Sequence, residues 1–252
     1  MYDKVLLPSV VYQPQPGAFG SLWVTRLTIT NTTDEDVAAY PHFEGSGGIE
    51  PPPGGQASPP LPANTTIAPF TFADTSVQRG TFFFIDSRFI DRIQISLRAQ
   101  DLSRQAQTWG TALPVIRGTE FADHVLSLND VRADPTSRMT LRVYSLDGTQ
   151  PATVRVSVYG IKAVLGLDIV PDVLLGVREF PLRTVSTSDP SGDVLTIPGF
   201  LELSQLDFIA PAGGFDRLRI DVLPVSPGTR IWAFVSVTNN ETQHVTIIAP
   251  SL

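Results

Sequence analysis

The stretch S-R-M-T-L-R-V-Y-S-L-D-G-T-Q-P-A-T-V-R-V-S-V-Y-G, from Ser137 to Gly160, decides the fold class. Apolar side chains occupy every second position on both sides of a turn at residues 146–151: Met139, Leu141 and Val143 before it, and Val154, Val156 and Val158 after it. A period of two is typical of a half-buried β-strand, and Asp-Gly with a following proline is typical of a turn. The stretch therefore predicts two successive strands.

A second stretch uses the same pattern. Trp23, Thr25, Leu27 and Ile29 alternate with polar residues in S-L-W-V-T-R-L-T-I-T-N, and the polar turn 31–36 then leads to another strand from Val37. We predict that residues 31–36 form a hairpin turn. Short strands separated by turn clusters predict an all-β chain built from antiparallel β-sandwiches.

The two stretches indicate an internal repeat. Setting Arg26 on Arg138 aligns R-L-T-I-T with R-M-T-L-R in phase. The strand after Gly80 then matches the one after Gly214, Arg92-Ile93 matches Arg230-Ile231, and Leu113-Pro114 matches Ala249-Pro250; upstream, residues 7–10 match residues 113–116. A rival register sets residues 91–95 on 216–220 and leaves the final hairpin unpartnered. Either register predicts two tandem domains, 1–112 and 113–252.

The segment 45–66 holds five glycines and six prolines in 22 positions. Composition alone suggests a linker between domains. The repeat instead places it between the strand ending near Phe43 and the strand after Gly80. We predict a semi-rigid, polyproline-like surface loop of the first sandwich.

Composition excludes several classes of function. The net charge is −7 and the charged fraction is 17%, with no basic run to bind a nucleic-acid backbone. There is no cysteine for a disulfide or a thiolate metal site. The most apolar window, 164–177, contains two aspartates and a proline and is too short to cross a bilayer. We expect no nucleic-acid partner and no membrane span.

The strand and turn motifs also resemble a known family. They are L-P-S-V at residues 7–10, G-S-L-W-V-T-R-L-T-I-T-N-T-T at 20–33, and S-V-T-N-N-E-T at 236–242. The series is similar to the tandem immunoglobulin-like repeats of exported proteins from soil-type bacteria. This chain departs from those repeats at residues 24–26, where they carry R-T-D, and at Asn239, where they carry aspartate. The resemblance implies Ig-like sandwiches and an extracellular, cell-surface or periplasmic location, with no assigned activity.

Acidic turns are candidate calcium sites, because Ca²⁺ takes carboxylate and carbonyl oxygens. The candidates are Asp34, Glu35 and Asp36 in one turn, Asp189 and Asp193 in another, and residues 129–134 in a third. None has the register of a dedicated calcium loop, and solvated turns that protect strand edges are the alternative.

Aromatic residues supply the candidate ligand site. Trp232 and Phe234 lie on the opposite strand face from Ile231, Ala233 and Val235, so a large apolar set lies on either face. Exposed, these rings would form a sugar-stacking platform with Trp109; buried, they would pack in a core or between domains.

These observations favour a non-enzymatic structural or adhesive protein with protein or glycan partners. The terminal segments K-V-L-L-P-S-V-V-Y and H-V-T-I-I-A-P are apolar and β-prone, so we expect them to form edges that pair with a neighbouring molecule. The alternatives are a carbohydrate-binding module that uses Trp109, Trp232 and Phe234, and a hydrolase that uses a pair of carboxylates.

Overall fold

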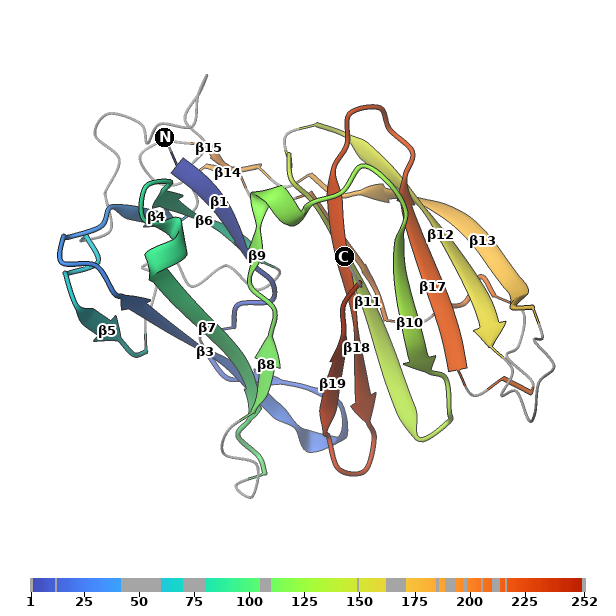
Figure 1. The fold of residues 1–252 in the computed structure, drawn as a ribbon. Coiled ribbons are helices and arrows are strands. Elements are labelled where there is room, and N and C mark those ends of the chain that lie inside the picture. The colour runs from blue at the N-terminus through green and yellow to red at the C-terminus, as the bar shows by residue number, and fades with distance from the viewer. Residues whose placement is uncertain are drawn as a thin grey trace. The chain divides into compact units, whose positions relative to one another are not determined.

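The computed structural model describes residues 2–11, 13–41, 60–69, 80–104, 110–148, 150–161, 171–184, 186–188, 194–196, 199–204, 206–209, 214–215 and 217–250. The chain is all-β and its strands form several antiparallel sheets (Figure 1). It divides into two compact units, residues 1–120 with 185–198 and residues 121–184 with 199–252. The loop predicted at 45–66 lies outside the described residues up to position 59.

The first unit contains two sheets and a small hairpin. The sheet ordered β4-β6-β1-β9 consists of Ala39–Pro41, Thr81–Asp86, Tyr2–Leu7 and Ile116–Arg117. The sheet ordered β2-β3-β7-β8 consists of Gln15–Pro16, Leu22–Asn31, Ile93–Asp101 and Thr111–Leu113, with β5 (Thr65–Ile67) paired to β3. The hairpin joins β14 (Ser186–Ser188) to β15 (Val194–Thr196).

The second unit contains two four-stranded sheets. One, ordered β10-β17-β12-β13, consists of Leu126–Arg132, Arg217–Pro224, Ala152–Ile161 and Val173–Leu182. The other, ordered β16-β11-β18-β19, consists of Gly199–Leu203, Ser137–Ser145, Ile231–Asn239 and Val245–Ile248. Figure 1 shows β10, β17, β12 and β13 side by side.

The alternating side chains of both sheets meet in the core of the second unit. Leu141 and Val143 of β11, Val154 and Val156 of β12, and Val235 of β18 are fully buried in one apolar cluster. Each fully buried Val or Leu side chain contributes roughly 1.5–3 kcal/mol of transfer free energy. The strands predicted from the alternation are confirmed, and their apolar faces form this core.

The order of strand pairing in the second unit repeats that in the first. In each unit a long strand (β3, β11) pairs antiparallel over nine residues with a strand far along the chain (β7, β18), which then pairs with the short strand that follows it (β8, β19). The pairs β1–β6 and β10–β17 correspond in the same way. The matches of Gly80 with Gly214 and of Ile93 with Ile231 both fall on corresponding strands. The upstream match of residues 7–10 with residues 113–116 does not fall on corresponding strands, because β1 belongs to one sheet and β8 to the other.

Two turns lie where the sequence pattern suggests a connection between paired strands. Each of them joins strands of different sheets. Residues 31–36 lead from β3 to β4, and residues 146–151 lead from β11 to β12. In both cases the flanking strands pair with other partners, so the hairpin predicted at 31–36 is wrong. The reason is burial. Both strands carry an apolar face, and placing them in opposed sheets directs both faces into one core.

The N-terminal segment is not the free sheet edge that we predicted from its apolar character. β1 lies inside its sheet, where it pairs with β6 along its whole length and with β9 through Val5 and Leu6. β9 follows Leu113 in the chain and pairs with β1. This pairing places residues 113–120 in the first unit. The boundary between the two units therefore falls at 120–121 rather than at the predicted 112–113.

A buried carboxylate joins β3 to the turn after β7. Asp101 Oδ1 accepts hydrogen bonds from the Leu22 N–H (2.8 Å), the Ser103 N–H (3.0 Å) and the Ser103 hydroxyl (2.7 Å), and Oδ2 lies 3.6 Å from Arg104 Nε. Burial alone would raise the pKa of Asp101, but these bonds and Arg104 outweigh it and lower the pKa.

We predict that Asp101→Asn destabilises the first unit by about 1–3 kcal/mol at neutral pH, because one charged acceptor of three hydrogen bonds is lost. The folded-state pKa is lowered, so the wild-type carboxylate stabilises the fold above its unfolded pKa of about 4, and this contribution is lost as the pH falls through the lowered value. Denaturant unfolding at several pH values measures the difference. A gap between variant and wild type that does not shrink toward low pH contradicts the assignment.

Candidate binding surface of the second unit

The two sheets of the second unit have four outermost strands, and three of these are protected. The edge of β16 is bridged by Arg183, whose N–H donates to Phe200 O (2.8 Å) and whose carbonyl accepts from the Phe200 N–H (3.0 Å). The edge of β10 is interrupted by a β-bulge between Leu128 and Val131. Charged bulges of this kind prevent regular pairing with another strand. β13 has a register shift as well, at Leu175. Of the edges described, β19 remains.

The bulge in β10 arises from Asn129-Asp130. Asp130 has a left-handed backbone with φ 62°, which asparagine and aspartate tolerate better than other non-glycine residues. Val131 then pairs with Leu218. The bulge directs the Asp130 carboxylate toward Arg217 of β17, which donates a hydrogen bond to it.

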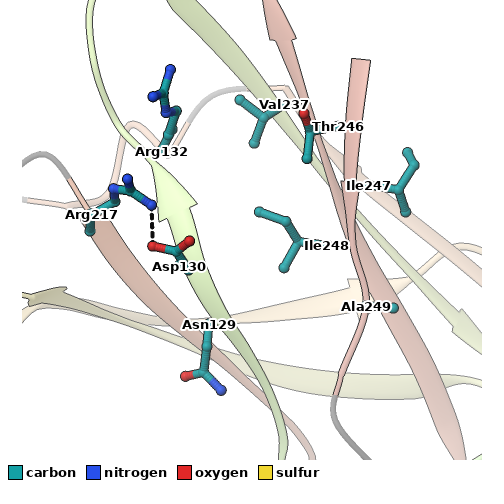
Figure 2. A pocket seen from close by; sticks show the side chains of 9 residues that line it. All are labelled: Asn129, Asp130, Arg132, Arg217, Val237, Thr246, Ile247, Ile248 and Ala249. Carbon is teal, nitrogen blue, oxygen red and sulfur yellow. Dashed lines mark hydrogen bonds and ion pairs between the residues drawn. The ribbon is translucent and has the colours of Figure 1, made fainter. Parts of the chain in front are cut away.

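A pocket of about 390 Å³ lies between β10 and β19. Figure 2 shows Asp130 and Ile248 pointing into it from opposite sides, whereas Ile247 points away. It is lined by Asn129, Asp130, Arg132, Arg217, Val237, Thr246, Ile247, Ile248 and Ala249. The pocket is therefore amphipathic, with aliphatic groups along β18 and β19 and ionic groups along β10 and β17.

The two arginines of the pocket differ in their partners. Arg217 is paired with Asp130. Arg132 Nη1 lies 4.0 Å from Asp134 Oδ2, and its side chain is 59% exposed. Asp134 is itself held by Thr136, whose hydroxyl and N–H hydrogen bonds lower the pKa of Asp134 despite its partial burial. Arg132 is thus the more accessible cation at this pocket.

The backbone of β19 directs half of its polar groups away from β18. The Asn239 N–H donates to His244 O (2.9 Å), so Asn239 and His244 form a hydrogen-bonded pair. Such pairs alternate along an antiparallel ladder, so Thr246 and Ile248 bond to β18 while Val245 and Ile247 direct their backbone groups outward. An extended chain beside β19 would meet those outward groups.

β13 is the other outermost strand of its sheet and is ten residues long, with a register shift at Leu175 and a proline at position 181. Its inner face is covered: Phe208 packs edge-on against Phe180 at 5.4 Å, and a Cβ on Gly176 would lie 2.8 Å from Phe208 O. Leu174 and Val177 lie on the outer face with 54% and 49% of their surface accessible, and Val173, opposite Gly160, is 41% accessible. No other described strand gathers three exposed large apolar side chains.

The structure buries the two described aromatic residues predicted as a sugar platform. Trp232 and Phe234 are 1% and 0% exposed and contact each other and Tyr144 at centroid distances of 5.4–6.4 Å. Their burial corrects the expectation of an open ring face at these positions. Tyr144 is buried beside them, and its own burial raises its pKa. The alternative role, packing, is the one they have. Trp109 lies outside the described residues.

The acidic turn at residues 34–36 is held by hydrogen bonds within the first unit. Asp36 Oδ1 accepts a hydrogen bond from the Ala63 N–H (3.0 Å), and the Glu35 carbonyl accepts from Asn31 and Thr33. No three histidine or acidic side chains in the described ranges are grouped so that they could hold a metal ion. Calcium also takes carbonyl and water oxygens, so the calcium site at Asp34, Glu35 and Asp36 stays a prediction. Asp189 and Asp193 lie outside the described residues.

Sequence reasoning missed Arg132, Val237 and Ile248 as members of one pocket, because the contact between β10 and the final hairpin depends on sheet packing. It singled out Asn129 and Asp130 as an acidic turn. Their signal was a polar pair inside an apolar strand, L-S-L-N-D-V-R, which is typical of a bulge.

The chain has no match among protein-family models, curated proteins or solved structures. Over the part of the chain that the structure describes, no helix has the length and apolar character needed to cross a membrane.

We predict that Phe234→Ala destabilises the second unit by about 3–5 kcal/mol, because the ring stacks on Tyr144 and Trp232 with the Arg142 guanidinium above it at 5.7 Å. Guanidinium unfolding followed by circular dichroism measures this. The control Val225→Ala, at a 38% exposed side chain, should change stability by less than about 1 kcal/mol. Equal effects of the two substitutions would contradict the packing role.

Proposed function

We propose that this chain is a non-enzymatic structural or adhesive protein that binds an extended polypeptide segment by strand addition at β19. The observation that carries the proposal is the coincidence of an open strand edge with an amphipathic pocket beside it. The edge supplies backbone hydrogen bonds, and the pocket supplies side-chain selectivity.

The hydrogen-bonding argument rests on β19. An added strand would form hydrogen bonds with the outward backbone groups of Ile247. Each bond contributes only about 0.5–1.5 kcal/mol net, so the ladder alone gives weak and unselective binding. Affinity and selectivity require side chains that are buried on addition.

The side-chain argument rests on the pocket. A residue placed opposite Ile248 would lie on the face that Val237 shares, and would bury apolar surface there. A residue two positions away, opposite Thr246, would lie on the same face and line the pocket with Arg132. The preferred partner segment therefore has an apolar residue and an acidic residue separated by one position.

The wider setting of the proposal is a pair of Ig-like β-sandwich modules in an exported protein. The repeated order of strand pairing and the two facing sheets of the second unit support the tandem arrangement. The resemblance of residues 20–33 and 236–242 to bacterial exported repeats supports the extracellular or cell-surface location.

Peptide binding tests the proposal. The probe is a fluorescein-labelled peptide of alternating valine and threonine, flanked by glutamates. Fluorescence anisotropy should show saturable binding to the wild-type chain. Ile247→Pro should weaken it about tenfold, because proline removes an outward N–H from the edge without breaking the bonds to β18.

Ile247→Thr is the matched control. It keeps the backbone N–H, and its side chain points away from the pocket, so it should bind like the wild type. Ile248→Asp should abolish binding by placing a charge against the apolar part of the pocket. The proposal is wrong if the wild type does not bind the peptide or if Ile247→Pro binds it unchanged.

A further inference from the structure

We infer that the outer face of β3 and β7 in the first unit binds an acidic polysaccharide chain. The site lies in the first unit and does not depend on strand addition at β19. The inference follows from a pair of opposed arginines, from the uncharged polar side chains that continue the same face, and from the charge of this face relative to that of the chain.

Two arginines face each other across β3 and β7. Arg26 pairs with Arg98 in the antiparallel register. The Thr32 N–H donates to Arg92 O, so the hydrogen-bonded pairs, which recur every second residue, include Arg26 with Arg98. Their Cα atoms are therefore about 5.5 Å apart, and both side chains leave from the same face of the sheet. Like charges directly opposite each other destabilise a sheet, and an anion bound between them would replace this repulsion with attraction.

The two guanidinium groups differ in their contacts. Arg98 Nη2 donates to the Gly110 carbonyl (2.9 Å). Gly110 has a left-handed backbone with φ 65°, and a Cβ there would lie 2.2 Å from Ala99 O, so glycine is required in the turn that holds Arg98. Arg26 is exposed and forms no hydrogen bond or ion pair with any described residue. Its charge is therefore available to a ligand.

Uncharged polar side chains continue the face beyond the arginines. They are Thr28 and Thr30 of β3, Ser96 and Gln94 of β7, and Thr66 of β5. Thr30 and Thr66 share a hydrogen bond of 2.9 Å between their hydroxyls. The side chains of Thr28, Ser96 and Gln94 form none with the described residues. Hydroxyl and amide groups both donate and accept hydrogen bonds, so this row can bond to the hydroxyls of a sugar in either sense.

The charge of this face is opposite to that of the chain. The chain carries a net charge of −7. Asp101 is the one acidic residue within β3 and β7, and it is buried at the position opposite Trp23, on the other face from the arginines. A local cluster of one sign attracts ions of the other sign even where the net charge repels them. Carboxylate and sulfate groups fit the planar donor fork of arginine.

The length of the face suits an extended chain better than a single anion. Arg92, also exposed, precedes Arg98 by six residues, which is about 20 Å along an extended strand. Its Nη2 donates to Thr32 O (3.2 Å) at the far end of the row. A ligand that lies along the strands would therefore meet arginine at both ends and hydroxyl groups between them.

Other anionic partners fit this face less well. β7 has a strand on each side, and β2 and β5 pair with parts of the other side of β3, so neither strand offers a long free edge to an acidic peptide. The outward positions of β3 and β7 carry no aromatic ring on which the bases of a single-stranded nucleic acid would stack. A hydroxyl-rich polyanion remains the ligand that matches both the charge and the hydrogen-bonding groups.

Biolayer interferometry on the full chain tests the inference. The probe is biotinylated polygalacturonate, and the control probe is the same polymer with its carboxylates methyl-esterified. The wild type should bind polygalacturonate with an affinity that falls as salt is added, because exposed charges are screened. It should not bind the ester. Dextran sulfate, used in parallel, distinguishes sulfate from carboxylate as the group that the arginines recognise.

Arg26→Glu is the variant that tests the arginine pair. It places an acidic side chain opposite Arg98, so binding should fall at least tenfold while the melting temperature stays the same or rises. Arg26→Lys keeps the charge but not the donor fork and should weaken binding severalfold. The matched control is Arg230→Glu, at an exposed arginine of the second unit, which makes the same change of charge and should bind like the wild type.

Each outcome either supports or overturns the inference. Binding of an acidic polymer that is lost in Arg26→Glu and kept in Arg230→Glu supports it. A wild type that binds neither acidic polymer, that binds the ester equally well, or that binds as well after Arg26→Glu overturns it. Tighter binding of oligothymidylate than of either polysaccharide overturns the choice of ligand. Ile247→Pro should leave polysaccharide binding unchanged, so failure of strand addition at β19 and failure of this site are distinguishable.

Discussion

Unpaired backbone groups at sheet edges are the constraint that shapes this protein. In an all-β chain every sheet ends in two strands that have a partner on one side only, and an open edge invites pairing with another molecule. In the first unit the outermost described strands are two or three residues long, which limits that hazard. The second unit uses a bulge at β10 and a backbone bridge at β16. The ten-residue strand β13 also has a register shift, at Leu175, and a proline, Pro181. Among the described residues β19 has neither a bulge nor a bridge, and this contrast is the basis for assigning it a function.

The same pairing rules connect the edges to the core. The nine-residue ladder between β11 and β18 places Leu141 and Val235 on the inner face, and Tyr144 and Trp232 on the other. Because the two faces alternate residue by residue, a shift of one position would exchange them. The buried inner face therefore fixes the register of β18, and through β18 it fixes which residues of β19 face the pocket. Thr246 and Ile248 face it for that reason.

The alternation of apolar and polar residues allowed the strands and their apolar faces to be predicted, as at residues 137–145. It gave little information about which strands pair with each other. The turn at 31–36 has hairpin composition, yet it joins two sheets, because the choice between the two depends on the distant strands β6 and β7. Trp232 and Phe234 posed a similar problem, since both faces of β18 are apolar and the sequence does not tell which face is covered. The N-terminal segment was predicted as an edge from its apolar character, and β9, only two residues long, made it internal. The acidic pair at 129–130 was recognised as polar, but its role in a bulge depends on the register with β17.

Amide hydrogen exchange, measured by NMR with and without the valine–threonine peptide, tests the central claim most directly. The account predicts that the amide of Ile247 in β19 becomes more protected when the peptide is added. The amides of Thr246 and Ile248, already bonded to β18, should change little. An exchange rate at Ile247 that the bound peptide leaves unchanged would contradict strand addition at β19.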